Sequence, residues 1–307
     1  MPALPEFEFE DAHLSLYLCY ELHYRGLPGV DDTWEWEPSL LELRRSLEAW
    51  FLSGLLADLG GPVLHGAPSK RAVEEQLLSM ATENADPGRN LARFLEYEAT
   101  AAQFREFVIH RSLYHLKEAD PHSWAIPRLT GSAKAALMEI QTDEYGSGSA
   151  ERMHSALFAK SMRALGLDDT YGRYLDLVPG STLATVNLMS MLGLQRRWSA
   201  AIAGHLALFE MSSSVPNRRY AAGLRRLGYG PDATDFFDEH VIADSAHELI
   251  AMTDLMGPLV AQGLGDKVLF GARSLDWVET KASEHILKRW RSGQSALTAR
   301  PGLVAAG

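Results

Sequence analysis

The amino-acid sequence predicts an all-α protein. Apolar residues recur at helical spacing along most of the 307 residues, and no convincing run alternates apolar and polar residues as a strand does. Glycine and proline stand where the periodic segments end, for example at Gly60-Gly61-Pro62 and at Asp120-Pro121. The sequence contains no internal repeat and no low-complexity segment, so we expect a single helical domain.

The first third of the chain is expected to hold an arm and two helices. Residues 1–35 are predicted to be irregular, because the segment is acidic and interrupted by proline. Pro38 suits a first helical turn, and the periodicity predicts a helix over 38–59. A long helix is predicted over 89–118, which ends because the residue before Pro121 is pushed out of helical geometry.

Five further helices are predicted in the rest of the chain. Their expected ranges are 131–145, 149–165, 181–211, 231–257 and 274–292. We therefore expect an N-terminal arm over 1–35, one helical domain over 36–295 and a flexible tail over 296–307.

Composition excludes several classes of function. The net charge of −11 argues against nucleic acid or an anionic membrane as the partner, since both reward clustered Lys and Arg. Cys19 is the only cysteine, which excludes an intrachain disulfide, a thiolate zinc site and an iron–sulfur cluster. The start, MPALPEFEFEDAH, does not have the pattern of a signal peptide, and no apolar run reaches membrane-spanning length. We expect a cytoplasmic protein.

Three residues in FFDEHVIADSAH (236–247) form a candidate metal half-site. His240, Asp244 and His247 fall within about 60° of one another on one helical face. Two imidazoles and a carboxylate suit iron or manganese better than structural zinc. An exposed helix face is the alternative interpretation, so the remaining ligands must come from other helices.

The segment DEYGSGSAERMH (143–154) supplies the strongest candidates for those ligands. Glu144 closes one predicted helix and His154 lies in the next, with two glycines between them. Glu118, at the end of the long helix, and Glu210, which closes an apolar run, are further candidates, because a buried unpaired carboxylate is costly.

Spacing leaves two competing choices open. Glu106 with His110 could replace Glu118, and Glu151 with His154 forms a Glu-x-x-His pair of the kind used by ferritin-like diiron bundles. Four histidines are each expected to be core or surface residues more readily than ligands: His110, His115, His205 and His285.

Charge counting favours two metal ions over one. Glu118, Glu144, Glu210 and Asp244 carry four negative charges, which two divalent ions would balance, whereas a single ion would leave surplus buried anions.

Together these segments resemble the haem-oxygenase-like diiron oxidases and oxygenases, also called iron-containing redox enzymes. The resemblance rests on 116–131, 134–168, the helix that ends at Glu210 and 236–247, which match in order and spacing. It implies a haem-oxygenase-like bundle of about seven helices. The metal ligands that it implies are Glu118, Glu144, His154, Glu210, His240, Asp244 and His247.

The resemblance also implies two Fe(II)/Fe(III) ions as cofactor and O2 as co-substrate. Its nearest branch oxygenates nitrogen, so we expect a peroxo-diferric species to attack the amine or guanidine group of an amino-acid-like small molecule. The alternative within enzymes is a diiron oxidase that desaturates, decarboxylates or cleaves an amino or fatty acid, with Arg218 or Arg219 as carboxylate anchor. A metal-free or haem-type helical binding protein is the alternative of another class. We further expect an external electron donor, no nucleic-acid or membrane partner, and a homodimer as the default assembly.

Overall fold

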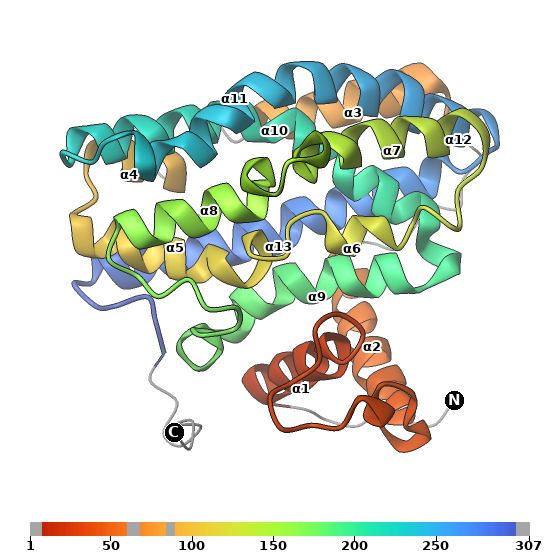
Figure 1. Ribbon diagram of the computed structural model, residues 1–307. Coiled ribbons are helices and arrows are strands. Elements are labelled where there is room, and N and C mark those ends of the chain that lie inside the picture. The colour runs from red at the N-terminus through yellow and green to blue at the C-terminus, as the bar shows by residue number, and fades with distance from the viewer. Residues whose placement is uncertain (1–7, 60–67, 84–89, 299–307) are drawn as a thin grey trace.

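The protein is built from helices packed around one long central helix, Ser199–Arg226. The computed structural model describes residues 8–59, 68–83 and 90–298, and every regular element in those ranges is helical, as the sequence predicts (Figure 1). The α-helices are α1 (Phe9–Glu21), α2 (Pro38–Leu59), α3 (Lys70–Glu83), α4 (Leu91–Tyr97), α5 (Ala101–His115), α6 (Asp120–Ser123), α7 (Gly131–Glu144), α8 (His154–Ala164), α9 (Gly180–Leu194), α10 (Ser199–Arg226), α11 (Pro231–Ile250), α12 (Met256–Ala261) and α13 (Gly265–Arg291). None of the helices in these ranges is both long and apolar enough to cross a membrane.

Helix α10 is the centre of the assembly. It packs against α11, α13, α4 and α9, while α1 and α2 form a pair beside α9 at the bottom of the view in Figure 1. Two glycines bring α10 and α13 together: a Cβ at Gly204 would overlap the Val268 carbonyl oxygen, and one at Gly271 would overlap the Ala201 carbonyl oxygen. The backbones therefore touch at this crossing, which fixes the position of α10.

We predict that Gly271→Ala lowers the free energy of unfolding by about 3 kcal/mol, because the new methyl group has no room between two backbones. Gly54→Ala is the matched control: Gly54 is also helical, but nothing lies within 4 Å of the position that its new methyl group would take. That control should raise stability by up to about 1 kcal/mol. Urea unfolding of both variants tests the prediction, and equal effects would show that the crossing is not tight.

The expected irregular arm is wrong in its central part, where helix α1 forms. Ala12, Leu16, Tyr17 and Tyr20 recur at helical spacing and are buried in the main core. The acidic, proline-containing start concealed this apolar stripe. The helix predicted over 38–59 is confirmed by α2, whereas α3 was not expected.

Other boundaries also differ from those expected. The helix predicted over 89–118 is two helices, because Thr100 and Gln103 form a capping box that starts α5. The helix predicted over 181–211 is α9 followed by α10, and α10 continues past Pro216 to Arg226. The chain thus forms more helices than the seven expected.

The C-terminal part follows the prediction more closely. Helix α11 continues through a π-helical stretch, Ala251–Leu255, into α12, and α13 begins nine residues earlier than expected, at Gly265 instead of residue 274. At the start of the expected tail, the Ala296 N–H donates to Glu106 Oε2 and the Thr298 N–H donates to the Leu177 carbonyl oxygen, each at 2.8 Å. Residues 299–307 lie outside the described residues.

Candidate metal centre

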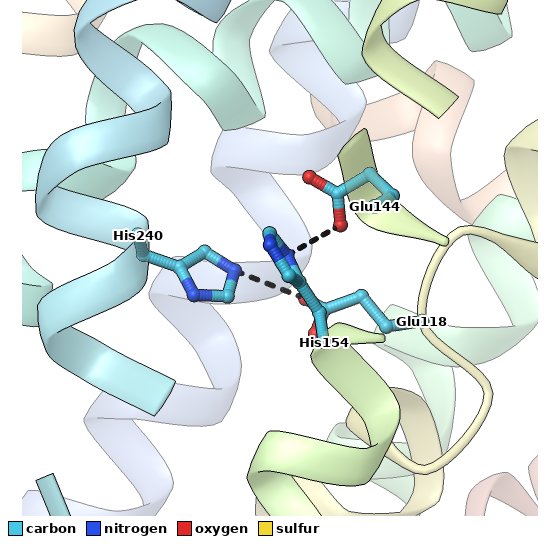
Figure 2. A group of neighbouring side chains, drawn as sticks. All are labelled: Glu118, Glu144, His154 and His240. Atoms are coloured by element: carbon cyan, nitrogen blue, oxygen red, sulfur yellow. Dashed lines mark ion pairs between the residues drawn. The ribbon is translucent and has the colours of Figure 1, made fainter. Parts of the chain in front are cut away.

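Two groups of buried side chains form a candidate metal centre between α5, α7, α8, α10 and α11. The first group contains Glu118, Glu144, His154 and His240, and the second contains Glu144, Glu210 and His247. Within each group, one ligand atom per residue lies within 4.8 Å of every other. Glu144 belongs to both groups, and no member of either is more than 7% exposed. Figure 2 shows the four side chains of the first group pointing toward one another.

Turns in the chain bring the first group together. Glu118 follows α5, and the chain then reverses at Ala119, whose φ of 73° is rare for a residue with a side chain. Glu144 is the last residue of α7, and His154 is the first residue of α8, which begins five residues later than the helix predicted over 149–165. Between them, a Cβ at Gly146 would lie only 2.6 Å from the Met153 nitrogen, so only glycine fits this turn.

Six of the seven predicted ligands therefore meet in space. Asp244 lies in α11, three residues before His247, and its side chain is outside the described residues. The competing choices lie elsewhere: Glu106 accepts hydrogen bonds from Trp290 Nε1 and the Ala296 N–H, and Glu151 is exposed.

Comparisons with known proteins show the family of this chain. The model of a family described as iron-containing redox enzymes matches residues 105–279, more than half of the chain. The chain belongs to this family. Its members are named for the iron they contain, and the enzyme is accordingly an oxidoreductase that acts with iron.

Two individual proteins are similar to this iron-containing redox enzyme. Nitrosourea synthase from Streptomyces achromogenes subsp. streptozoticus is 30% identical over 155 residues, which are 50% of this chain and 32% of that protein. The chain thus spans about a third of the relative's length. The crystal structure of a CADD-like protein of unknown function from Nostoc punctiforme superposes with a TM-score of 0.56 and 16% identity, covering 71% of this chain and 97% of the other, which shows a shared fold.

In this iron-containing redox enzyme, the side chains of the first ligand group are arranged as metal ligands and not as hydrogen-bond partners of one another. His154 Nδ1 lies 2.8 Å from Glu144 Oε2, yet the contact lacks hydrogen-bond geometry, and Glu118 Oε2 has no hydrogen-bond partner among the described residues. Buried polar atoms without partners are costly, whereas imidazole nitrogen and carboxylate oxygen are ligands that iron accepts.

The charges around Glu118 hold it ionised. Burial alone would raise its pKa, but His115 and His240 outweigh burial and keep the pKa well below its usual range. His115 Nδ1 donates to Glu118 Oε1 at 2.8 Å, and His240 Nε2 lies 3.6 Å from the same oxygen. His240 Nδ1 donates to the Phe236 carbonyl oxygen at 2.8 Å, which orients the ring and leaves Nε2 facing the centre.

A histidine lies between the carboxylates of the second group. His247 Nδ1 is 3.2 Å from Glu210 Oε2 and 3.8 Å from Glu144 Oε1. Burial lowers the His247 pKa, but the hydrogen bond and charge of Glu210, with Glu144 and Asp143, raise it to about 9. Burial and the charge of Glu144 raise the pKa of Glu210. The two carboxylates thus require a nearby positive charge.

Sequence reasoning missed several residues around the centre. His115 was expected to be a core or surface residue, but it holds Glu118; its spacing of three from Glu118 was the available signal. The two acids that precede His240 in the sequence form ion pairs with arginines. Asp238 pairs with Arg225, and Glu239 pairs with Arg152. Tyr114, His122 and Phe209 line the cavity of the centre, and no sequence pattern marked them.

Proposed function

We propose that this enzyme is a non-haem diiron oxygenase that uses O2 to oxidise a nitrogen of an amine or guanidine group in an amino-acid-like small molecule. The observation that carries the proposal is the presence of Glu144 in both ligand groups. A carboxylate has two oxygens and can bind two neighbouring ions, so a shared glutamate favours two metals over one.

Each ion would have its own set of ligands beside Glu144. Glu118, His154 and His240 would hold the first, and Glu210 and His247 would hold the second. Asp244 is proposed as a further ligand of the second ion because it lies on the same helix as His247. With Asp244 included, four carboxylates balance two divalent cations.

The surroundings suit a reaction that must exclude bulk water. Iron, when bound, supplies the reductive activation of O2. Tyr114, Leu206 and Phe209 cover the cavity with apolar surface, which limits the access of water to the ligand atoms. His115 holds the carboxylate of Glu118 through a charge-assisted hydrogen bond, and the Phe236 carbonyl holds His240.

Nitrogen oxidation is supported by the name of the curated relative, since a nitrosourea carries an oxidised nitrogen. Because the chain spans only about a third of that protein, the substrate, the oxidation step and the external electron donor belong to the proposal. Three buried acids in one cavity argue against a haem pocket, which needs an axial ligand and an apolar slot.

Anaerobic Fe(II) loading followed by isotopically labelled O2 tests this function. We expect two irons per chain and, with amine-bearing amino acids, a product that gains labelled oxygen on nitrogen while its carbon skeleton stays intact. A product that has lost CO2 or hydrogen and gained no label would instead indicate an oxidase that acts on carbon. An iron content well below two per chain would refute the diiron centre.

A further inference from the structure

One buried acceptor in the metal cavity has no partner and is not a candidate ligand. Gln141 lines the cavity and is 1% exposed, yet its Oε1 has no hydrogen-bond partner among the described residues. Among the residues that line this cavity, Glu118 Oε2 is the only other such side-chain atom, and a metal ion would satisfy it. The Gln141 oxygen still requires a partner, because a buried polar atom without one is costly.

Both hydrogens of the Gln141 amide are used, which fixes the orientation of the side chain. Nε2 donates to the Ala119 carbonyl oxygen at 2.9 Å and to Ser123 Oγ at 2.7 Å. The contact with a carbonyl oxygen requires the NH2 group at this end of the amide, so Oε1 lies at the other end. Ser123 Oγ in turn contacts the Tyr145 hydroxyl at 2.9 Å, which donates to Asp120. A continuous hydrogen-bond network thus holds the amide.

The Gln141 side chain connects the segments that carry two candidate ligands. Gln141 is three residues before Glu144 on α7, a spacing that places both side chains on one helical face. Its partner Ala119 directly follows Glu118 and has a φ of 73°. The unpaired oxygen therefore belongs beside the first ligand group, which contains both glutamates.

The missing partner must be a small hydrogen-bond donor. An amide oxygen can only accept, and the carboxylates of Glu118 and Glu144 in the same cavity are acceptors as well. The free space in the cavity is about 10 Å³, roughly what one water molecule needs. Direct binding of a metal to Oε1 is a poorer explanation, because amide oxygens suit calcium and magnesium better than iron and the first group already offers four ligands.

We propose that Gln141 is a positioning residue whose Oε1 accepts a hydrogen bond from a water ligand of the metal in the first ligand group. The metal polarises that water and makes it a strong donor, while the fixed amide supplies the acceptor. The inference rests on the proposed function for the presence of a metal. It deepens that function, because an exchangeable water marks the coordination position that an incoming small ligand can take.

The fixed acceptor discriminates between small ligands by their hydrogens. A ligand with an O–H keeps the hydrogen bond to Oε1, whereas an anion without hydrogen, such as azide, loses it and brings a second acceptor to the amide oxygen. Gln141 therefore favours water over azide at this position. Removal of the amide oxygen should reverse that preference, whereas a substitution that merely loosened the centre would not make azide bind more tightly.

Azide titration of the Co(II)-loaded full-length protein, followed by the visible absorption of Co(II), tests the inference. Gln141→Leu should bind azide about 10-fold more tightly than wild type, which corresponds to one hydrogen bond. Ser123→Ala is the matched control, because it removes one of the two acceptors of Nε2 and leaves Oε1 in place. Its azide affinity should stay within about 2-fold of wild type.

The crystal structure of the Co(II)-loaded wild type is a direct test that needs no variant. A metal-bound oxygen should lie about 2.5–3.0 Å from Gln141 Oε1. Direct coordination of the metal by Oε1, or the absence of a solvent molecule that contacts both Oε1 and a metal, would overturn the inference. Equal azide affinities in wild type and Gln141→Leu would do the same.

Failure of this inference differs from failure of the proposed function. A centre that binds two metals but has no water at Gln141 overturns this inference alone. A water between the metal and Gln141, together with a product that gains no oxygen on nitrogen, would refute the proposed nitrogen oxidation and leave the role of Gln141 standing. A protein that binds no metal would refute both.

Discussion

Replacing Glu144 by alanine is expected to reduce bound iron from the proposed two ions per chain to fewer than one. The carboxylate of Glu144 belongs to both ligand groups, so its loss removes a ligand and a negative charge from each. Substitution of residues that only orient a ligand already weakens metal binding by about 10- to 100-fold, and loss of a direct ligand should cost at least about 100-fold at each position. Iron per chain, measured after anaerobic loading with stoichiometric Fe(II) and desalting, gives the result.

Two further variants make this result specific to a shared ligand. Glu210→Ala removes a member of the second group only, so about one iron should remain. Glu151→Ala changes the exposed acid of the competing Glu-x-x-His pair and should leave two. If Glu144→Ala and Glu210→Ala retained the same single iron, Glu144 would not be shared between the positions.

Misfolding would also lower the iron content, and a direct control separates the two causes. Glu144 is the last residue of α7 and is not part of the apolar core, and the chain turns away immediately after it. The metal-free Glu144→Ala protein should therefore keep the helical circular dichroism of the metal-free wild type. A collapse of that signal would mean that iron loss reflects unfolding and not the removed ligand.

The sequence predicts helices well where one element has one apolar stripe and a clear stop. Pro38 and the sequence Gly60-Gly61-Pro62, which predicted a helix end at residue 59, are such signals. It fails where two signals overlap: the capping box at Thr100 lies inside a continuous apolar pattern, and Pro216 lies inside a helix that continues. Helix α1 was missed because its acidic first turn concealed the stripe that packs on α9.

The candidate ligands could be proposed from sequence because residue type limits them. An inward acid at the end of an apolar segment, such as Glu210, needs a positive partner, and that requirement is visible without coordinates. An ion pair between distant helices could not be found in this way. Arg111 and Glu279 are 168 positions apart, and either one alone resembles a surface charge on an amphipathic helix. Only the folded structure, in which the Arg111 side chain of α5 reaches the Glu279 side chain of α13, shows that the two form a pair.

A buried ion pair beside the metal centre is expected to have the largest effect on stability. Lys117 and Glu21 are 1% and 2% exposed, and Lys117 Nζ donates to Glu21 Oε2 at 2.8 Å. The rings of Tyr24 and Tyr17 surround the ammonium group, with centroids 4.1 and 4.9 Å from Nζ, and the Tyr171 hydroxyl donates to Glu21. The pair joins α1 to the residue that precedes Glu118.

Glu21→Met should lower the free energy of unfolding by about 3–5 kcal/mol, because it leaves the Lys117 ammonium group buried without its counter-charge. The tyrosine rings remain around the ammonium group but do not supply a counter-charge, since a desolvated cation–π contact contributes only about 2 kcal/mol. The double variant Glu21→Met/Lys117→Met removes both charges and fills the space with apolar side chains, so it should recover most of the lost stability. Urea unfolding of wild type, both single variants and the double variant forms a complete cycle. Additive losses in the double variant would show that the two side chains contribute independently and that the ion pair does not hold α1 against the metal centre.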